Sequence, residues 1–315
     1  GKRSIPGLID EISKLTRISL AEQAEEVEKN QRQIASLTTK NLEAYKFYDL
    51  GEKAFYRLDF KDAIENYLKA IDVDSSFALA LYKLAYSYQW NFNNKKRDIY
   101  INKAVQNIES VPDKERLYIR AESIKDYKSR IPIYKEIVNK YPNEKQAYFE
   151  IGDMLYHNGK ILDSIEFFEK SYKLDPSFEF AIQHLGWAYI DSDRYQKNLV
   201  LAKQSLSYYP NDPAYINGEL SAYRLAGLFD EYFSKVREIQ SSEVQLINTD
   251  IAFGDGYFYQ GDYGKAKEKY LSVKDTPNNK VRSINKLIDI ATTRGNLIEY
   301  KKLSDELLSL YTEND

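Results

Sequence analysis

Residues 44–77 read AYKFYDLGEKAFYRLDFKDAIENYLKAIDVDSSF, and a pattern of the same kind returns until the C-terminus. The successive segments start at Ala44, Ala78, Val111, Lys145, Glu179, Pro213, Ile247 and Val281, at spacings of 33 or 34 residues. A period of this length indicates stacked helix pairs, in which each pair covers the apolar flank of the next. We therefore expect one repeat array, although a length of 315 residues would allow about two domains.

Composition restricts the class of protein. The 45 basic and 48 acidic residues are spread along the chain without the basic stripe of a nucleic-acid-binding protein. No apolar run approaches the ~18 residues that would span a bilayer, and the lack of cysteine excludes disulfides, thiolate metal sites and cysteine nucleophiles. The start at Gly1 and the single methionine, Met154, indicate a soluble fragment of a longer protein, cytoplasmic or extracytoplasmic, whose natural N-terminus and any membrane anchor would lie outside it.

Each segment predicts two helices around a tight turn. Leu81, Leu84 and Tyr88 fall on one helical face. The turns are marked by residues that favour unusual backbone angles: Gly159, Asp193, Gly227, Gly261 and Gly295. Proline ends several second helices, at Pro142, Pro176 and Pro210. Pro132 is expected to delay or kink the second helix of its unit.

Residues 1–43 do not follow the period. Apolar residues at helical spacing within residues 5–20 and the more polar residues 21–40 predict a helical lead-in. Such a segment would cap the first repeat or link it to an upstream domain, because a terminal repeat has an exposed apolar edge. We expect two parts, a lead-in over residues 1–43 and a repeat array over residues 44–315.

The segment 44–77 resembles a tetratricopeptide repeat, and so do its successors through residue 315. That family places small residues where the two helices of a pair cross, because a large side chain there would strain the packing. The matching residues are Gly51, Ala63, Ala70, Gly152, Ser164, Ser171, Gly186, Ser205, Gly254 and Ala266. The third, sixth and eighth units depart, with Tyr118, Leu220 and Ile288 in the first helix and Arg130, Tyr232 and Tyr300 in the second.

This resemblance implies an all-α, right-handed α-solenoid of about eight helix pairs, whose first helices line a concave groove. The residues that it places on or near the groove are Tyr48, Glu52, Phe55, Tyr82, Tyr86, Trp90, Phe149, Asp153, Tyr156, Trp187, Asn217, Asp255 and Phe258. Aromatic anchors beside carboxylates suit an extended peptide or a partner helix. The same rings serve equally well as packing between repeats.

The acidic groove positions Glu52, Asp153, Asp255 and Asp289 predict a partner that carries basic residues, and a solvated helix face explains them equally well. Some relatives hold a C-terminal carboxylate with lysine, asparagine and arginine on consecutive first helices. The first two units here do not reproduce that clamp.

No catalytic, cofactor or metal site is predicted. The two histidines, His157 and His184, have no cysteine beside them, and a metal needs three or four converging ligands. Gly254, Gly256 and Gly261 miss the spacing of a phosphate loop and follow no strand, which leaves Gly256 without a role. The carboxylates show no pairing that general acid and base catalysis would require.

A narrower resemblance concerns the origin of the module. Residues 9–20, 37–48, 77–90 and 111–123 are similar, in this order, to the C-terminal repeat module of bacterial serine/threonine kinases and nucleotide cyclases. The sequence therefore favours a noncatalytic protein-binding scaffold or sensor of a larger bacterial signalling protein. The alternatives are an adaptor that oligomerises through its convex face or an array end, an extracytoplasmic small-ligand sensor, and a helical-repeat enzyme.

Overall fold

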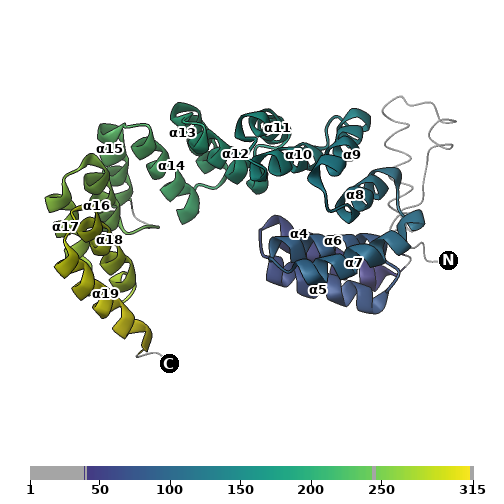
Figure 1. Ribbon diagram of the computed structural model, residues 1–315, viewed down its shortest axis with the longest axis horizontal. Coiled ribbons are helices and arrows are strands. Elements are labelled where there is room, and N and C mark those ends of the chain that lie inside the picture. The colour runs from purple at the N-terminus through teal and green to yellow at the C-terminus, as the bar shows by residue number, and fades with distance from the viewer. Residues whose placement is uncertain (1–38, 40, 243–245, 313–315) are drawn as a thin grey trace. The chain divides into compact units, whose positions relative to one another are not determined.

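The structure is a computed structural model that describes residues 39, 41–242 and 246–312. These residues form sixteen α-helices, one 3-10 helix (η1, Ile108–Ser110) and no β-strand. Figure 1 shows the helices following one another along the chain. They form eight pairs: α4 (Leu42–Tyr56) with α5 (Phe60–Val73), α6 (Ala78–Trp90) with α7 (Asn94–Gln106), α8 (Asp113–Ser123) with α9 (Tyr127–Lys140), α10 (Lys145–His157) with α11 (Ile161–Leu174), α12 (Glu179–Asp191) with α13 (Tyr195–Tyr208), α14 (Pro213–Leu225) with α15 (Phe229–Gln240), α16 (Thr249–Gln260) with α17 (Tyr263–Ser272), and α18 (Lys280–Thr293) with α19 (Leu297–Thr312).

The first helix of each pair begins where the period predicts. Four of the eight starts coincide with the predicted residue, and the others differ by one or two residues. The all-helical fold of eight pairs is therefore confirmed. The lead-in predicted for residues 1–43 lies almost entirely outside the described residues and stays a prediction.

Seven of the eight pairs contain a turn residue in the left-handed backbone region. Gly227, which follows α14, has a φ of 72°, and Asp193 takes the same region with a φ of 57°. The sequence marked five of these seven residues. It missed Leu58 and Phe92, because neither residue type favours a positive φ.

The two helices of several pairs cross at a glycine. A Cβ added to Gly51, Gly152 or Gly254 would lie 2.4–2.7 Å from the aromatic ring of Tyr67, Phe168 or Tyr270 on the second helix. The other small residues of the crossings, such as Ala63 and Ser164, are fully buried. The predicted role of small residues at the crossings is thus confirmed for these pairs.

The departure in the sixth unit is accommodated by the next unit. Tyr232 of α15 donates a hydrogen bond from its hydroxyl to the carbonyl of Ala252 at 2.6 Å. Its ring covers Gly256 of α16, where an added Cβ would lie 2.5 Å from Tyr232 Cε1. Gly256 therefore has a packing role that the sequence alone did not reveal.

The prediction that Pro132 delays its helix is wrong. The helix α9 begins at Tyr127, and Pro132 lies in its second turn. Asp126 caps the start by accepting a hydrogen bond from the backbone N–H of Ser129 at 2.9 Å. As the sixth residue of the helix, Pro132 removes the backbone hydrogen bond to the carbonyl of Lys128, while the cap at Asp126 stabilises the turn before it.

The chain divides into two compact units, each described by itself below. Unit 1 ends at Ala181 and contains α4–α11 with the first residues of α12, and unit 2 starts at Ile182 and contains the rest. The repeat period gives no indication of this division. Among the described residues, no helix is both long and apolar enough to cross a membrane.

Replacing two glycines of the same helix hairpin, Gly218 and Gly227, by alanine should change the free energy of unfolding in opposite directions. A Cβ at Gly218, inside α14, or at Gly227 meets no atom within 4 Å. Gly227→Ala should lower the free energy of unfolding by about 1–2 kcal/mol, because its φ is left-handed. Gly218→Ala should raise it by up to about 1 kcal/mol, because alanine favours a helix interior. Urea denaturation of both variants checks the pair, and equal signs would contradict the backbone assignment.

Candidate functional site

In unit 1, the aromatic residues predicted for the groove pack against one another. Phe55 of α4 stacks on Phe180 with ring centroids 5.4 Å apart. Trp90 of α6 and Phe149 of α10 lie 4.8 and 5.6 Å from the same ring. Phe55 and Phe149 are buried, and Trp90 is half-buried. These rings therefore join repeats that are distant in sequence, and their surfaces are covered by protein.

The tyrosines predicted for the groove in unit 1 are also in contact with other side chains. Tyr48 lies 5.1 Å from the ring of Phe77, and the buried Tyr82 lies 6.1 Å from the ring of Tyr86. The half-buried Tyr156 lies 6.3 Å from the ring of Phe168. Tyr48 and Tyr82, together with Glu52, also line a cavity of about 170 Å³ in unit 1, so ligand binding by these residues stays a prediction.

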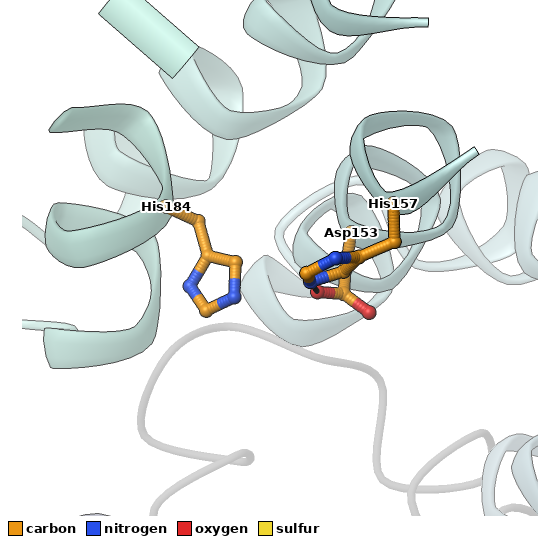
Figure 2. A group of neighbouring side chains, drawn as sticks. All are labelled: Asp153, His157 and His184. Carbon is orange, nitrogen blue, oxygen red and sulfur yellow. Dashed lines mark ion pairs between the residues drawn. The ribbon is translucent and has the colours of Figure 1, made fainter. Parts of the chain in front are cut away.

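The acidic groove positions of unit 1 already have partners. Lys83 Nζ lies 3.0 Å from Glu52 Oε2, and the hydroxyl of Tyr67 donates a hydrogen bond to the same carboxylate. His157 Nε2 lies 3.2 Å from Asp153 Oδ1 on the preceding turn of α10, as the dashed line in Figure 2 marks. This hydrogen bond raises the pKa of His157. Glu52 and Asp153 therefore each have a partner within the chain, and a basic ligand at these residues stays a prediction.

Glu150 of α10 is a buried acid that was not predicted. It accepts a hydrogen bond from the hydroxyl of Tyr86 on α6. Burial raises its pKa well above the ordinary value, and the nearby Glu122 carboxylate raises the pKa further. The folded chain therefore retains a proton at Glu150 that the unfolded chain loses at lower pH.

This raised pKa predicts a pH-dependent stability. Between the ordinary carboxyl pKa and the raised one, the folded state binds more protons than the unfolded state, so stability falls as pH rises. Glu150→Gln keeps an oxygen that accepts from Tyr86 and carries no charge. The free energy of unfolding of this variant should therefore fall less with rising pH than that of the unsubstituted chain, as urea titrations at several pH values would measure. Glu268→Gln, at an exposed residue of α17, is the control, and parallel curves for Glu150→Gln and the unsubstituted chain would contradict the assignment.

Unit 2 contains an open apolar cavity of about 380 Å³ between α12, α13 and α14. Its wall includes Ile190, Leu201 and Tyr215. Trp187 also lines it, with 45% of its surface exposed and its ring centroid 4.6 Å from that of His184, which is buried on α12. This cavity, named the apolar cavity below, offers space for a large apolar side chain.

A second cavity of unit 2, with a volume of about 360 Å³, lies between α14, α15, α16 and α18. Three cations, Arg224, Arg282 and Lys286, and one carboxylate, Asp255, line it, so that its charged residues carry an excess of two positive charges. Asp255 accepts a hydrogen bond from the Tyr270 hydroxyl at 2.8 Å and lies 3.0 Å from Lys286 Nζ. We call this space the basic cavity.

Arg224 of α14 is held in place chiefly by aromatic rings. Its guanidinium carbon lies 4.4 Å from the ring centroid of Tyr259 and 5.9 Å from that of Tyr232. The ion pair with Asp255 is long, with 3.9 Å between Nη1 and Oδ2. The buried Nε has no hydrogen-bond partner among the described residues. The guanidinium is therefore fixed and keeps unused hydrogen-bonding capacity.

The apolar and basic cavities adjoin each other along α14. Gly218 and Ser221 line both of them. Gly218 is exposed, and the wall between the cavities carries no side chain at that position. One extended ligand could therefore contact both cavities while its backbone passes over Gly218.

Of the groove residues predicted in unit 2, Trp187 lines the apolar cavity, and Asn217 and Asp255 line the basic one. Phe258 lines neither and packs 5.5 Å from the ring of Tyr263. The prediction missed Gly218, Arg224, Arg282 and Lys286. Gly218 could have been found from the repeat period, because it is a glycine inside a predicted helix that serves neither a turn nor a helix crossing. The three cations could be assigned to a site only once their ion-pair partners were known.

One part of the chain matches a known protein family. Residues 131–177, from α9 through α11, match the family described as tetratricopeptide repeat. The match covers this part of the chain, one second helix and the helix pair that follows it. No curated protein matches it.

Several solved tetratricopeptide-repeat and related structures are similar to the chain. PilW, described as a type IV pilus biogenesis factor, is 16% identical over 75% of this chain and 94% of its own, with a TM-score of 0.45. Yeast Tom70 is 16% identical over 88% and 62%, with a TM-score of 0.47. YrrB, described as having an unusual peptide-binding site, is 20% identical over 54% and 89%, with a TM-score of 0.31. Likeness at this level says nothing about what the present chain binds.

Proposed function

We propose that this tetratricopeptide-repeat chain is a noncatalytic scaffold that binds a protein or peptide along α14 of unit 2. The observation that carries the proposal is the meeting of the apolar and basic cavities at Gly218. The helices α14, α16 and α18 that supply most of the basic cavity are all first helices of their pairs. In this family the first helices are the ones expected to line the groove.

Two features support a binding role over catalysis. Trp187 presents a large exposed ring beside the apolar cavity, and such rings are frequent anchors of binding interfaces. Asp255, the one carboxylate lining either cavity, is engaged by Tyr270 and Lys286 and is poorly placed to accept a proton from a substrate. Rigid helices that present these groups lower the ordering cost of association.

The wider setting of the module also belongs to this proposal. The resemblance of four segments, residues 9–20, 37–48, 77–90 and 111–123, to repeat modules of bacterial kinases and cyclases supports a docking or sensing role within a larger signalling protein. This part of the proposal rests on sequence resemblance alone.

Selection from a random peptide display library tests the proposed function. Selected peptides should lose affinity about tenfold or more with Trp187→Ala, as measured by fluorescence anisotropy. They should lose affinity with Gly218→Leu as well, since a large side chain would obstruct the passage between the cavities. Tyr300→Ala, at an exposed ring on α19 that lines neither cavity, is the control.

Two outcomes would contradict the proposal. Peptides whose affinity is unchanged by Trp187→Ala and Gly218→Leu would place the interaction elsewhere. A tight dimer in analytical ultracentrifugation, with no selected peptides, would favour an adaptor that oligomerises.

A further inference from the structure

The position of Gly218 is not explained by the packing of the chain itself. Glycine in a helix interior costs about 1 kcal/mol relative to alanine. Gly51, Gly152 and Gly254 are required by a ring of the opposite helix, and Gly227 by its positive φ. A Cβ at Gly218 would meet no atom within 4 Å, and no positive φ is present there. The missing side chain therefore benefits something outside the described chain, such as the backbone of a ligand.

The charges beside Gly218 indicate the chemistry of that ligand. The guanidinium carbon of Arg224 lies 4.4 Å from the Tyr259 ring centroid, and its buried Nε has no hydrogen-bond partner within the part of the chain that the structure describes. A planar guanidinium of this kind suits a carboxylate, which it can bind through two parallel hydrogen bonds. A peptide carboxylate in the basic cavity would accept hydrogen bonds from this guanidinium, which lines the cavity.

The two cations of α18 strengthen this preference. Lys286 is neutralised in part by Asp255 at 3.0 Å. Arg282, in the first turn of α18, is exposed and forms no ion pair with any residue that the structure describes. With Asp255 already bonded to Tyr270 and Lys286, a basic ligand would meet Arg224 and Arg282 at close range and be repelled. The expectation of a basic partner, drawn from Asp255 in the sequence, finds no support in this cavity.

The neighbouring apolar cavity indicates a second property of the ligand, a large apolar side chain. It is large enough for a leucine, methionine or aromatic side chain, and Trp187 and Ile190 provide apolar walls. The two cavities share Gly218 and Ser221, so both requirements fall on one short segment of the partner.

We propose that the partner presents an extended acidic segment, with a large apolar side chain in the apolar cavity, an Asp or Glu carboxylate in the basic cavity, and its backbone crossing Gly218. This inference rests on the proposed function and deepens it by naming the class of partner. Glycine at position 218 then lowers the stability of α14 and allows the backbone of the bound partner to approach this helix closely.

Dye-labelled synthetic peptides test this proposal by fluorescence anisotropy. Each peptide contains one leucine and two glutamates in a glycine-serine background, and the spacing between these residues varies across the set. In matched peptides, lysine, serine or phosphoserine replaces glutamate. Every peptide is made with a free and with an amidated C-terminus. At least one glutamate peptide should bind, bind more weakly at high salt, and exceed its lysine counterpart by about tenfold or more. Amidation should leave its affinity unchanged, because the carboxylate comes from a side chain.

Matched variants distinguish the effect of the basic cavity on binding from the effect of the overall charge of the chain. Arg282→Glu should weaken the glutamate peptide about tenfold or more, whereas Arg294→Glu makes the same change of charge at the end of α18, outside both cavities, and should weaken it less than about twofold. Gly218→Ala should also weaken binding while it stabilises the fold, an outcome that a merely structural glycine would not produce.

The outcomes distinguish this inference from the proposed function. If serine or lysine peptides bind as tightly and still depend on Gly218, the acidic class is wrong while the proposed function stands. Tighter binding of phosphoserine with no binding of glutamate would replace the carboxylate by a phosphate and overturn the proposal. Equal effects of Arg282→Glu and Arg294→Glu on affinity would also overturn the proposal. So would the failure of every synthetic peptide to bind. In that case the selection from the display library decides whether the proposed function fails as well.

Discussion

The structure depends on a contact that recurs in several helix pairs, in which a glycine of the first helix faces an aromatic ring of the second. Gly51 with Tyr67, Gly152 with Phe168, and Gly254 with Tyr270 are each separated by sixteen residues, and in each case an added Cβ would lie less than 3 Å from the ring. Because the ring fills the space that a side chain would take, the two helices approach closely and leave an apolar flank. The next pair covers that flank, so the period of the sequence and the order of the helices have the same physical origin.

Aromatic residues serve different ends in the two units. In unit 1, Phe55, Trp90, Phe149 and Phe180 gather into one cluster, which buries much of their surface and joins helices that are distant in sequence. In unit 2, Trp187 stays exposed beside a cavity that its neighbours do not fill. The contrast is confined to these rings, because Tyr48 and Tyr82 of unit 1 also line a cavity, of about 170 Å³.

The repeat period predicted the fold well because it reflects contacts between sequence neighbours. Helix starts, the turn glycines and the small residues at the crossings all follow from such local constraints. Three features could not be predicted in this way. The ring of Phe55 contacts Phe180 across several repeats, Pro132 is tolerated through its place near a capped helix start, and Gly256 is required by a tyrosine of the preceding pair.

The candidate site shows the same limit. The sequence placed Trp187, Asn217 and Asp255 near a groove, and these three residues line the two cavities of unit 2. It could not show which charges of the basic cavity are already paired, so the basic ligand expected at Asp255 stays a prediction. Asp255 is engaged by Tyr270 and Lys286, whereas Arg224 Nε has no partner among the described residues.

Hydrogen exchange of the chain with and without a selected peptide tests the central claim most directly, namely that the first helices of unit 2 form the binding surface. The account predicts slower exchange of backbone amides in α14 around Gly218 and in α18 around Arg282, with α15 and α19 little changed. Protection confined to second helices, or to unit 1, would contradict it.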